Sequence, residues 1–389
     1  VTLPLVMILL DVWPLKRLEF SPKGLMLQLK EKLPLLALSA VIALLSIWGR
    51  DYPSMKPLPL MERIVNAPIA LIAYLTKTFW PQDMAIFYPF PNAIPLWKTA
   101  VAFLVIAALT ATFIFMIKRL PCLFVGWLWF LTSITPVLGI IQVGRSTYAM
   151  TDRYHYLPSI GLAIMLAWGI PAFFKSDFLR KIALPMGILF LSIMSIIAWK
   201  QCGYWKDSIS LFQHALRVTK DNDVANNLLG VSYYKKGFYA QAVKHYTEAI
   251  RNHPDNADGY YFGRAKAFCA LRRYRQAIDD YNQALRLKPD YSDDVYNELG
   301  FAYYQLGSLS KAMDCFTEAI RLNENFTSAY KNRGTVYAEL GQTQMALADF
   351  SRAIILQKHD AESYGKRGLL YFRLGRYAEA VGDFSEVIR

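Results

Sequence analysis

The sequence predicts an all-α fold in which a polytopic transmembrane helix bundle is followed by an α-solenoid. Three observations support it: long apolar runs in the first 200 residues, a repeat of 34–35 residues in the second half, and a change of composition between them. Residues 1–200 hold 18 Lys and Arg against 8 Asp and Glu, whereas residues 201–389 hold 25 against 22. This division excludes a single globular domain, a disordered chain and a disulfide-rich secreted scaffold.

The apolar runs are long enough to cross a bilayer, which takes about 20 predominantly apolar residues. Five runs without a charged residue cover positions 33–49, 99–117, 121–141, 154–174 and 182–199. Residues 1–10 have the character of the end of a further span, so we expect the bundle to be truncated. A weaker run at 64–80 is interrupted by Asn66, Pro68 and Lys77, and we expect it to be re-entrant or interfacial.

The basic connections orient the predicted bundle. Lys and Arg concentrate at 16–32, 118–119 and 175–181, and these fall on one side of the membrane if the run at 64–80 does not cross. That side is then cytoplasmic, which places residues 50–98, 142–153 and everything after Trp199 outside the cytoplasm. Membrane topology therefore explains the pI of about 9.4, and we expect no nucleic-acid partner.

The repeat is defined by small and aromatic residues at fixed spacing. A small residue recurs at Gly230, Ala265, Gly300, Gly334 and Gly368, with an alanine twelve residues later and an aromatic residue four beyond that. A glycine marks the turn of each repeat except the second, which has Arg272. This pattern resembles the tetratricopeptide repeat. We therefore expect a membrane domain at 1–200, a linker with a half-repeat at 201–222 and five repeats at 223–389, the last incomplete.

The resemblance implies a concave groove that binds a partner or acceptor protein. Its expected lining from the first helix of each repeat is Asn227, Val231, Phe262, Asn297, Phe301, Lys331 and Thr335. These residues lack the Lys/Asn clamp with which some relatives grip a terminal carboxylate. The alternative, that they only solvate or pack the inner face, stays open.

The candidate substrate site is the loop and helix start at 142–161. Charge-assisted hydrogen bonds from Arg153, together with Arg145, suit the phosphate of a lipid-linked substrate, with Asp152 orienting the guanidinium beside Tyr154 and Tyr156. The alternative is that these residues are interfacial anchors. A second loop at 79–97, aromatic and rich in proline, is either an interfacial belt or one wall of a cavity for a polyprenyl chain or an acceptor peptide.

No metal or cofactor is expected. His155 is the only histidine in the first 200 residues, and Cys122, Cys202, Cys269 and Cys315 form no CxxC pair. No nucleophile elbow, phosphate loop or HExxH motif occurs.

Four segments resemble membrane glycosyltransferases of the GT-C type that carry C-terminal tetratricopeptide repeats, in particular the bacterial branch of the transmembrane O-mannosyltransferase family. They are residues 1–18, the loop at 79–97, GWLWFLTSITPVLGIIQVG at 126–144 and DRYHYLPSIG at 152–161. The resemblance implies a bacterial inner-membrane enzyme that transfers a sugar from a polyprenyl-phosphate donor to a protein hydroxyl, on the extracytoplasmic face. It also implies catalytic acidic residues upstream of residue 1. The alternative function is a non-enzymatic membrane-anchored scaffold for envelope or polysaccharide assembly.

Overall fold

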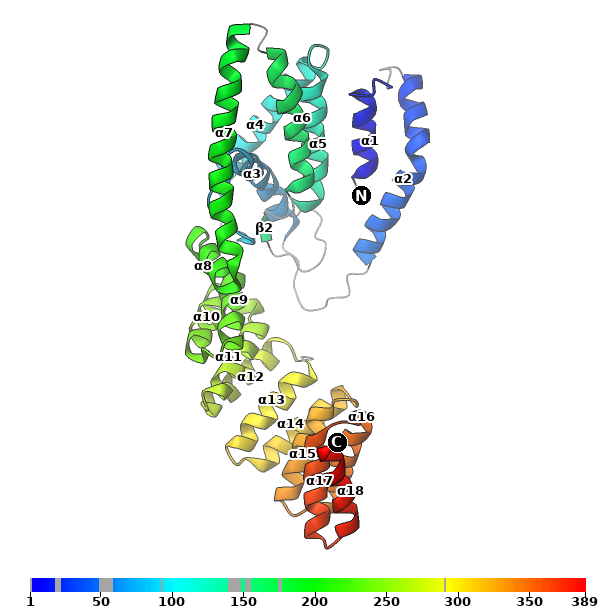
Figure 1. Cartoon of the computed structure of the whole chain (residues 1–389), viewed down its shortest axis with the longest axis vertical. Helices are drawn as coiled ribbons and strands as arrows, with labels where there is room; N and C mark the ends of the chain where they lie inside the picture. Colours follow the sequence, from blue (N-terminus) through cyan, green and yellow to red (C-terminus); the bar gives the residue numbers. More distant parts are fainter. Residues whose placement is uncertain are drawn as a thin grey trace. The chain divides into compact units, whose positions relative to one another are not determined.

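The computed structural model describes residues 2–17, 22–48, 59–91, 94–138, 148–150, 155–173, 177–289 and 292–389. Over these residues the chain is predominantly helical, which confirms the predicted all-α class. Contacts divide it into two compact units, Val1–Ala225 and Asn226–Arg389 (Figure 1). We refer to them as the helical unit and the repeat unit.

The helical unit contains eight helices among its described residues. They are α1 (Leu3–Val12), α2 (Pro22–Trp48), α3 (Leu60–Phe79), α4 (Leu96–Phe115), α5 (Pro121–Ile134), α6 (Tyr156–Phe173), α7 (Asp177–Gly203) and α8 (Ser208–Val218). Helix α8 begins where Asp207 caps it, because the Asp207 carboxylate accepts hydrogen bonds from the backbone N–H groups of Ile209 and Ser210. Short 3-10 turns, η1 (Thr135–Val137) and η3 (Tyr204–Lys206), follow α5 and α7.

Two short strands join the two loops that the sequence marks as candidate sites. Strand β1 (Tyr88–Pro89) pairs antiparallel with β2 (Tyr148–Met150), with Tyr88 opposite Met150. The side-chain amide of Asn66 on α3 donates to the carbonyl of Ala149 over 3.2 Å. The loop after α3 and the segment before α6 are therefore held side by side on α3.

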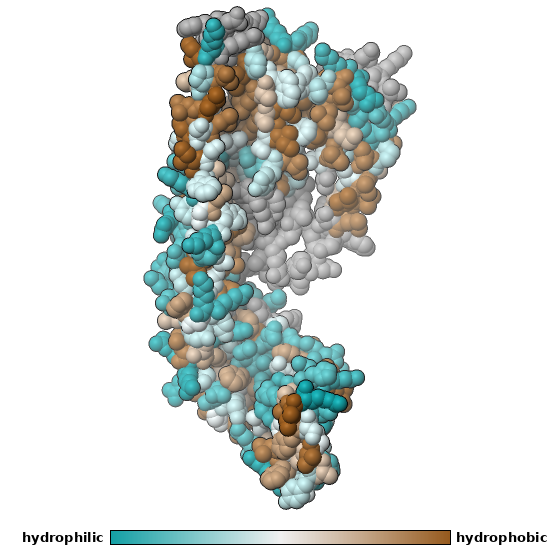
Figure 2. All heavy atoms as spheres, in the orientation of Figure 1, coloured by the Kyte–Doolittle hydropathy of each residue, from teal (hydrophilic) through white to brown (hydrophobic). Residues whose placement is uncertain are grey.

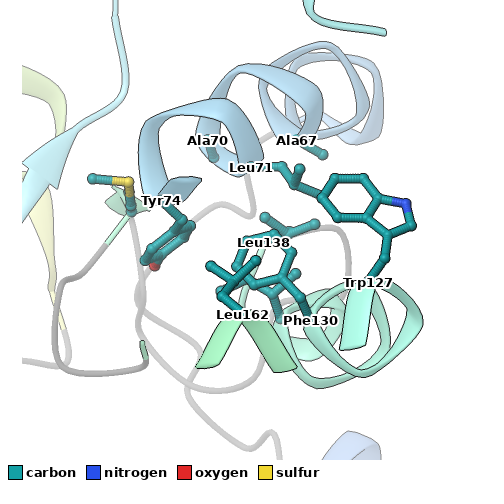
Figure 3. Close-up of a cluster of buried hydrophobic side chains, with 10 residues drawn as sticks. Ala67, Ala70, Leu71, Tyr74, Trp127, Phe130, Leu138 and Leu162 are labelled. Atoms are coloured by element: carbon teal, nitrogen blue, oxygen red, sulfur yellow. The ribbon is translucent and has the colours of Figure 1, made fainter. Parts of the chain in front are cut away.

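One hydrophobic cluster holds α3, α5 and α6 together (Figure 3). From α3 come Ala67, Ala70, Leu71 and Tyr74, which pack against the fully buried rings of Trp127 and Phe130 on α5. The first turns of α3, before this contact begins, expose Leu60, Met61 and Ile64.

Helices α5 and α6 approach so closely that their contact accepts only glycine. A Cβ built on Gly126 would overlap the carbonyl oxygen of Gly161, and a Cβ on Gly161 would overlap that of Gly126. Small residues of this kind let two helix backbones approach each other, most often in membranes. This contact fixes the position of the start of α6.

Two helices among the described residues are long and apolar enough to cross a membrane. They are Leu96–Phe115 and Leu184–Lys206, and three shorter apolar helices cover Leu3–Val12, Pro121–Val137 and Tyr156–Ala172. The described part of the predicted run at 121–141 ends at Leu138, after α5 has passed into η1, and the predicted run at 33–49 lies within α2. By length and apolarity the described residues support two spans, where the sequence predicted five. Figure 2 shows hydrophobic residues gathered on the surface of α7, where Leu184, Leu191 and Ile196 are exposed.

The repeat unit is a series of helical hairpins. Its helices are α9 (Asp223–Lys235), α10 (Tyr239–Asn252), α11 (Asp258–Ala270), α12 (Tyr274–Leu287), α13 (Asp293–Gln305), α14 (Leu309–Leu322), α15 (Thr327–Glu339), α16 (Thr343–Leu356), α17 (Ala361–Arg373) and α18 (Tyr377–Ile388), with a 3-10 turn η4 (Pro254–Asn256). The turn residues Gly237, Gly307, Gly341 and Gly375 have φ between +73° and +81°, which glycine adopts at no steric cost. Arg272, the predicted exception, takes the same left-handed conformation at φ 59°.

The small residue of each first helix packs against the aromatic ring of the second helix, as the spacing of these residues predicts. A Cβ on Gly300 would lie 2.7 Å from the Phe316 ring, and one on Gly230 would lie 2.9 Å from the ring of Tyr246. The corresponding Ala265 is fully buried. Each small residue therefore leaves room for the aromatic ring of the second helix of its hairpin.

Three of the five hairpins contain a buried ion pair that the sequence analysis did not identify. Arg264, Arg333 and Arg367 each bind an aspartate sixteen residues later through two nitrogens, at 2.7–2.9 Å, and the three acceptors are Asp280, Asp349 and Asp383. The acceptors are 5–6% exposed. In the other two hairpins an apolar Leu229 or Leu299 replaces the arginine, with His245 or Cys315 in place of the aspartate.

We expect Gly161→Ala to destabilise the helical unit by about 1–3 kcal/mol, because the added methyl overlaps the α5 backbone. The matched control is Gly187→Ala on α7, where a Cβ meets nothing within 4 Å and a gain of up to about 1 kcal/mol in helix propensity is expected. Thermal unfolding in detergent measures both. Equal melting temperatures for the two variants would contradict the close α5–α6 contact.

We expect Arg333→Leu to destabilise the α15–α16 hairpin by about 3–5 kcal/mol, because Asp349 is left buried without its partner. Adding Asp349→Cys reproduces the Leu299 and Cys315 pair of the α13–α14 hairpin and should restore most of the loss. Amide hydrogen exchange of α15 and α16 in the whole chain reports the change. A double variant as unstable as the single one would show that the ion pair is not interchangeable with the apolar pair.

Candidate functional site

The structure describes one of the five residues predicted to bind the substrate. Tyr156 is the first residue of α6 and is 82% exposed. Arg145, Asp152, Arg153 and Tyr154 lie outside the described residues, so their roles remain predictions from the sequence. In the sequence they lie on either side of β2.

His155, the residue before α6, is fixed by contacts with α3. Its Nε2 lies 2.5 Å from the Thr78 hydroxyl, and its ring stacks on that of Tyr74 with centroids 5.7 Å apart. Because the single hydroxyl proton of Thr78 is donated to the Tyr74 carbonyl, Nε2 of His155 is the donor in this pair. The backbone entering α6 is thus held at the end of α3.

A cavity of about 790 Å³ opens beside these contacts, and we call it the junction cavity. Four segments line it: the loop after α3, the start of α6, the end of α7 with η3, and α8. The lining residues are Pro81, Met84, Ala85, Ile86, His155, Tyr156, Ser159, Ala198, Gln201, Cys202, Tyr204, Trp205, Leu211 and His214. Four residues of the loop at 79–97 line this cavity, while its role in receiving a polyprenyl chain or an acceptor peptide stays a prediction.

His214 on α8 was not identified by the sequence analysis, although it is among the most buried residues of the cavity wall. Its ring is 7% exposed, stacks on Tyr204 at 3.7 Å and is hydrogen bonded to the Met84 backbone. Its Nε2 has no hydrogen-bond partner among the described residues. Burial lowers the pKa of His214, so the neutral form is favoured. The only sequence signal was a lone histidine on an amphipathic helix, which is no specific indication of a site.

Some of the predicted groove residues already make hydrogen bonds or ion pairs within the chain, and others are only half-buried. Asn297 is buried and accepts a hydrogen bond from Asn332 over 2.9 Å. Lys331 binds Glu362 at 2.8 Å and Asp360 at 3.3 Å, and both partners belong to the next repeat. Asn227, Phe262 and Phe301 are half-buried on α9, α11 and α13.

The inner face is therefore closed at one end and more open at the other. In the last two repeats Lys366 also binds Glu362, at 2.8 Å, and donates to the hydroxyl of Thr335. In the first two, Lys266 lies over the rings of Phe262 and Tyr234, at 5.5 and 6.0 Å, and makes no ion pair with a described residue. Sequence reasoning missed Lys266, which follows Phe262 by one helical turn.

No group of three His, Cys, Asp or Glu residues that could hold a metal ion occurs in the part of the chain that the structure describes. Cys269 and Cys315 are half-buried, and desolvation of their thiols raises the pKa values to about 11 and about 12, which favours the protonated form. The thiolate, which is the nucleophilic form, is therefore disfavoured at both positions.

Family models match the repeat unit along most of its length. A TPR repeat model matches residues 265–307, and tetratricopeptide repeat models match 224–256, 294–326 and 331–389. The repeat unit consists of tetratricopeptide repeats. The predicted register of small, alanine and aromatic residues is thereby confirmed.

Two curated proteins are similar to the tetratricopeptide region. Protein O-mannosyl-transferase Tmtc2 of Drosophila melanogaster is 28% identical over 115 residues, which are 29% of this chain and 12% of that protein. Protein O-mannosyl-transferase TMTC4 of Homo sapiens is 29% identical over 104 residues, 26% of this chain and 14% of that protein. The chain thus matches about an eighth of the length of these relatives.

Solved structures of tetratricopeptide proteins are also similar. MamA of Desulfovibrio magneticus is 15% identical and covers 47% of this chain and 94% of its own, with a TM-score of 0.39. YrrB, described as a TPR protein with an unusual peptide-binding site, is 21% identical over 46% of this chain and 90% of its own, with a TM-score of 0.39. A thermophilic TPR protein of Thermus thermophilus is 24% identical over 43% of this chain and 90% of its own, with a TM-score of 0.36.

We expect Lys331→Met to raise the pKa of Glu362, which hydrogen bonds from Lys331 and Lys366 lower to about 2. Because this pKa is depressed, the stabilisation is complete above the ordinary Glu value of about 4.3 and is lost as the pH falls through about 2. Side-chain carboxyl NMR of Glu362 measures the shift. The control Lys266→Met should leave it unchanged, and an unmoved pKa in Lys331→Met would show that Lys331 points into the groove instead.

Proposed function

We propose that this protein is a membrane glycosyltransferase that moves a sugar from a polyprenyl-phosphate donor to a protein acceptor, and that its tetratricopeptide repeats bind the acceptor or a partner protein. One observation carries the proposal. A single chain combines repeats that are 28–29% identical to those of two O-mannosyl-transferases with helices whose apolar side chains are exposed.

Placement in a membrane is part of this proposal, and the exposure of apolar side chains supports it. Leu184, Ile188 and Leu191 on α7 are 58–69% exposed, and Phe103 and Phe115 on α4 are 62% and 86% exposed. Soluble monomers seldom expose contiguous apolar surface of this extent, because it is costly in water. The shorter helices α5 and α6 would complete a polytopic bundle around the Trp127 cluster.

The basic connections support one orientation of this bundle. With Lys118 and Arg119 after α4 and Lys181 at the start of α7 on the cytoplasmic side, the junction cavity and the repeats lie on the extracytoplasmic side. A bacterial inner membrane fits this arrangement. Lipid-linked sugar and acceptor protein would then meet on the same side.

A non-enzymatic scaffold is the second candidate. It is favoured by the extent of the similarity, which is confined to the repeats and covers 12% and 14% of the two relatives. Tetratricopeptide repeats bind proteins without performing chemistry, so a scaffold would need the same repeat unit and no transfer activity.

Sugar transfer by the full-length protein in membranes, normalised to its abundance, decides between the two. If Arg153 binds the donor phosphate with its planar guanidinium, Arg153→Lys lowers transfer and Arg153→Ala lowers it further, while expression stays near normal. The matched control is Arg119→Lys, an exposed arginine on the predicted cytoplasmic side. Full transfer by Arg153→Lys would make Arg153 a simple anchor, and no transfer by the unaltered protein would favour the scaffold.

A further inference from the structure

The junction cavity has no fixed charge in its wall. None of its lining residues is Lys, Arg, Asp or Glu, and the polar ones include Ser159, Gln201 and the favoured neutral form of His214. An anion enclosed there would lose its hydration without gaining an ionic partner. The part of a ligand that enters the cavity is therefore apolar.

The cavity lies at the end of the apolar helix α7. Ala198, Gln201 and Cys202 line it from the last turns of α7, at the end of an apolar stretch in which no residue is buried. Trp199 and Trp205 are 82% and 63% exposed at this end, as aromatic residues are at membrane interfaces. A hydrocarbon chain can reach the cavity from a bilayer along α7.

Two lysines are close in sequence to the cavity residues of α7 and η3: Lys200 lies between Ala198 and Gln201, and Lys206 follows Trp205. Lys200 and Lys206 are exposed, and neither makes an ion pair with a described residue. Unpaired cations beside interfacial tryptophans are complementary to the phosphate of an anionic lipid.

We propose that the junction cavity holds one acyl chain of an anionic phospholipid, with the lipid phosphate bound at Lys200 and Lys206. This rests on the membrane placement of α7 in the proposed function. A volume of about 790 Å³ is in the range for one compact ligand and too small to enclose a long polyisoprenoid. The lipid is therefore a resident component, distinct from the sugar donor whose phosphate we assign to Arg153.

The bound chain would support helix α8. Leu211 and His214 of α8 face the same cavity as Met84 and Ala85 of the loop after α3. These segments already share a hydrophobic cluster, in which Ala85 of the loop and Ala215 of α8 are buried, and the Asn222 side chain after α8 donates a hydrogen bond of 3.0 Å to the Phe87 carbonyl. An acyl chain between them adds apolar contact on both sides and should slow hydrogen exchange of residues 208–218.

The test uses the whole chain purified from membranes into nanodiscs of phosphatidylglycerol, of phosphatidylcholine, and of phosphatidylcholine with undecaprenyl phosphate. Native mass spectrometry counts retained lipid. We expect retained phosphatidylglycerol, a retention about tenfold lower in Ala198→Trp, which fills the cavity, and faster exchange of α8 in that variant; tenfold corresponds to about 1.4 kcal/mol. Ser195→Trp, one turn earlier on α7 and outside the cavity wall, is the matched control.

The outcomes separate this proposal from its rivals. Lipid loss in Lys200→Glu/Lys206→Glu together with Ala198→Trp supports it. Retention of undecaprenyl phosphate in place of phospholipid overturns it, as does unchanged retention in Ala198→Trp. Phospholipid retained by a protein without sugar transfer supports the lipid site and overturns only the proposed function.

Discussion

Close approach of helix backbones is the constraint on which both units depend. At Gly126 and Gly161 a single methyl group would force α5 and α6 apart, and this contact sets where α6 begins. In the repeats the same requirement recurs at Gly230 and Gly300, where an aromatic ring occupies the space that a Cβ would take. Packing at this density leaves a backbone little freedom to adjust, so local choices of residue determine the arrangement of whole helices.

The buried carboxylates of the repeat unit are neutralised by arginines of the same hairpin. The buried aspartates Asp280, Asp349 and Asp383 each receive a two-pronged arginine, and the two hairpins without this pair have neither an arginine nor an aspartate at these positions. This agreement between paired positions follows from the large cost of a single buried charge. These positions hold either an Arg–Asp ion pair or a leucine with His245 or Cys315, and loss of the arginine alone would leave a buried aspartate without its partner.

How much could be predicted from the sequence depended on how far apart the interacting residues are. The repeat register follows from a strict period, so Gly300 and Phe316 could be placed before the structure was known. Lys331 could not be placed, because its partner Glu362 lies 31 residues further on, and a position on the groove face says nothing about a neighbouring carboxylate. The β1–β2 pairing escaped prediction because strands of two and three residues leave no periodic signal.

The distribution of ion pairs on the inner face of the repeats indicates where a charged ligand can bind without breaking an existing ion pair. A ligand at Lys331 must first break ion pairs with Glu362 and Asp360, so its own charges replace contacts that already exist. Lys266 lies over aromatic faces and interacts electrostatically with the half-buried Glu298, but a ligand there has no ion pair with a described residue to break. The same reasoning applies to the end of α7, where cations without ionic partners among the described residues adjoin an uncharged cavity. We therefore expect an acidic ligand to bind more readily at the first two repeats than at the last two.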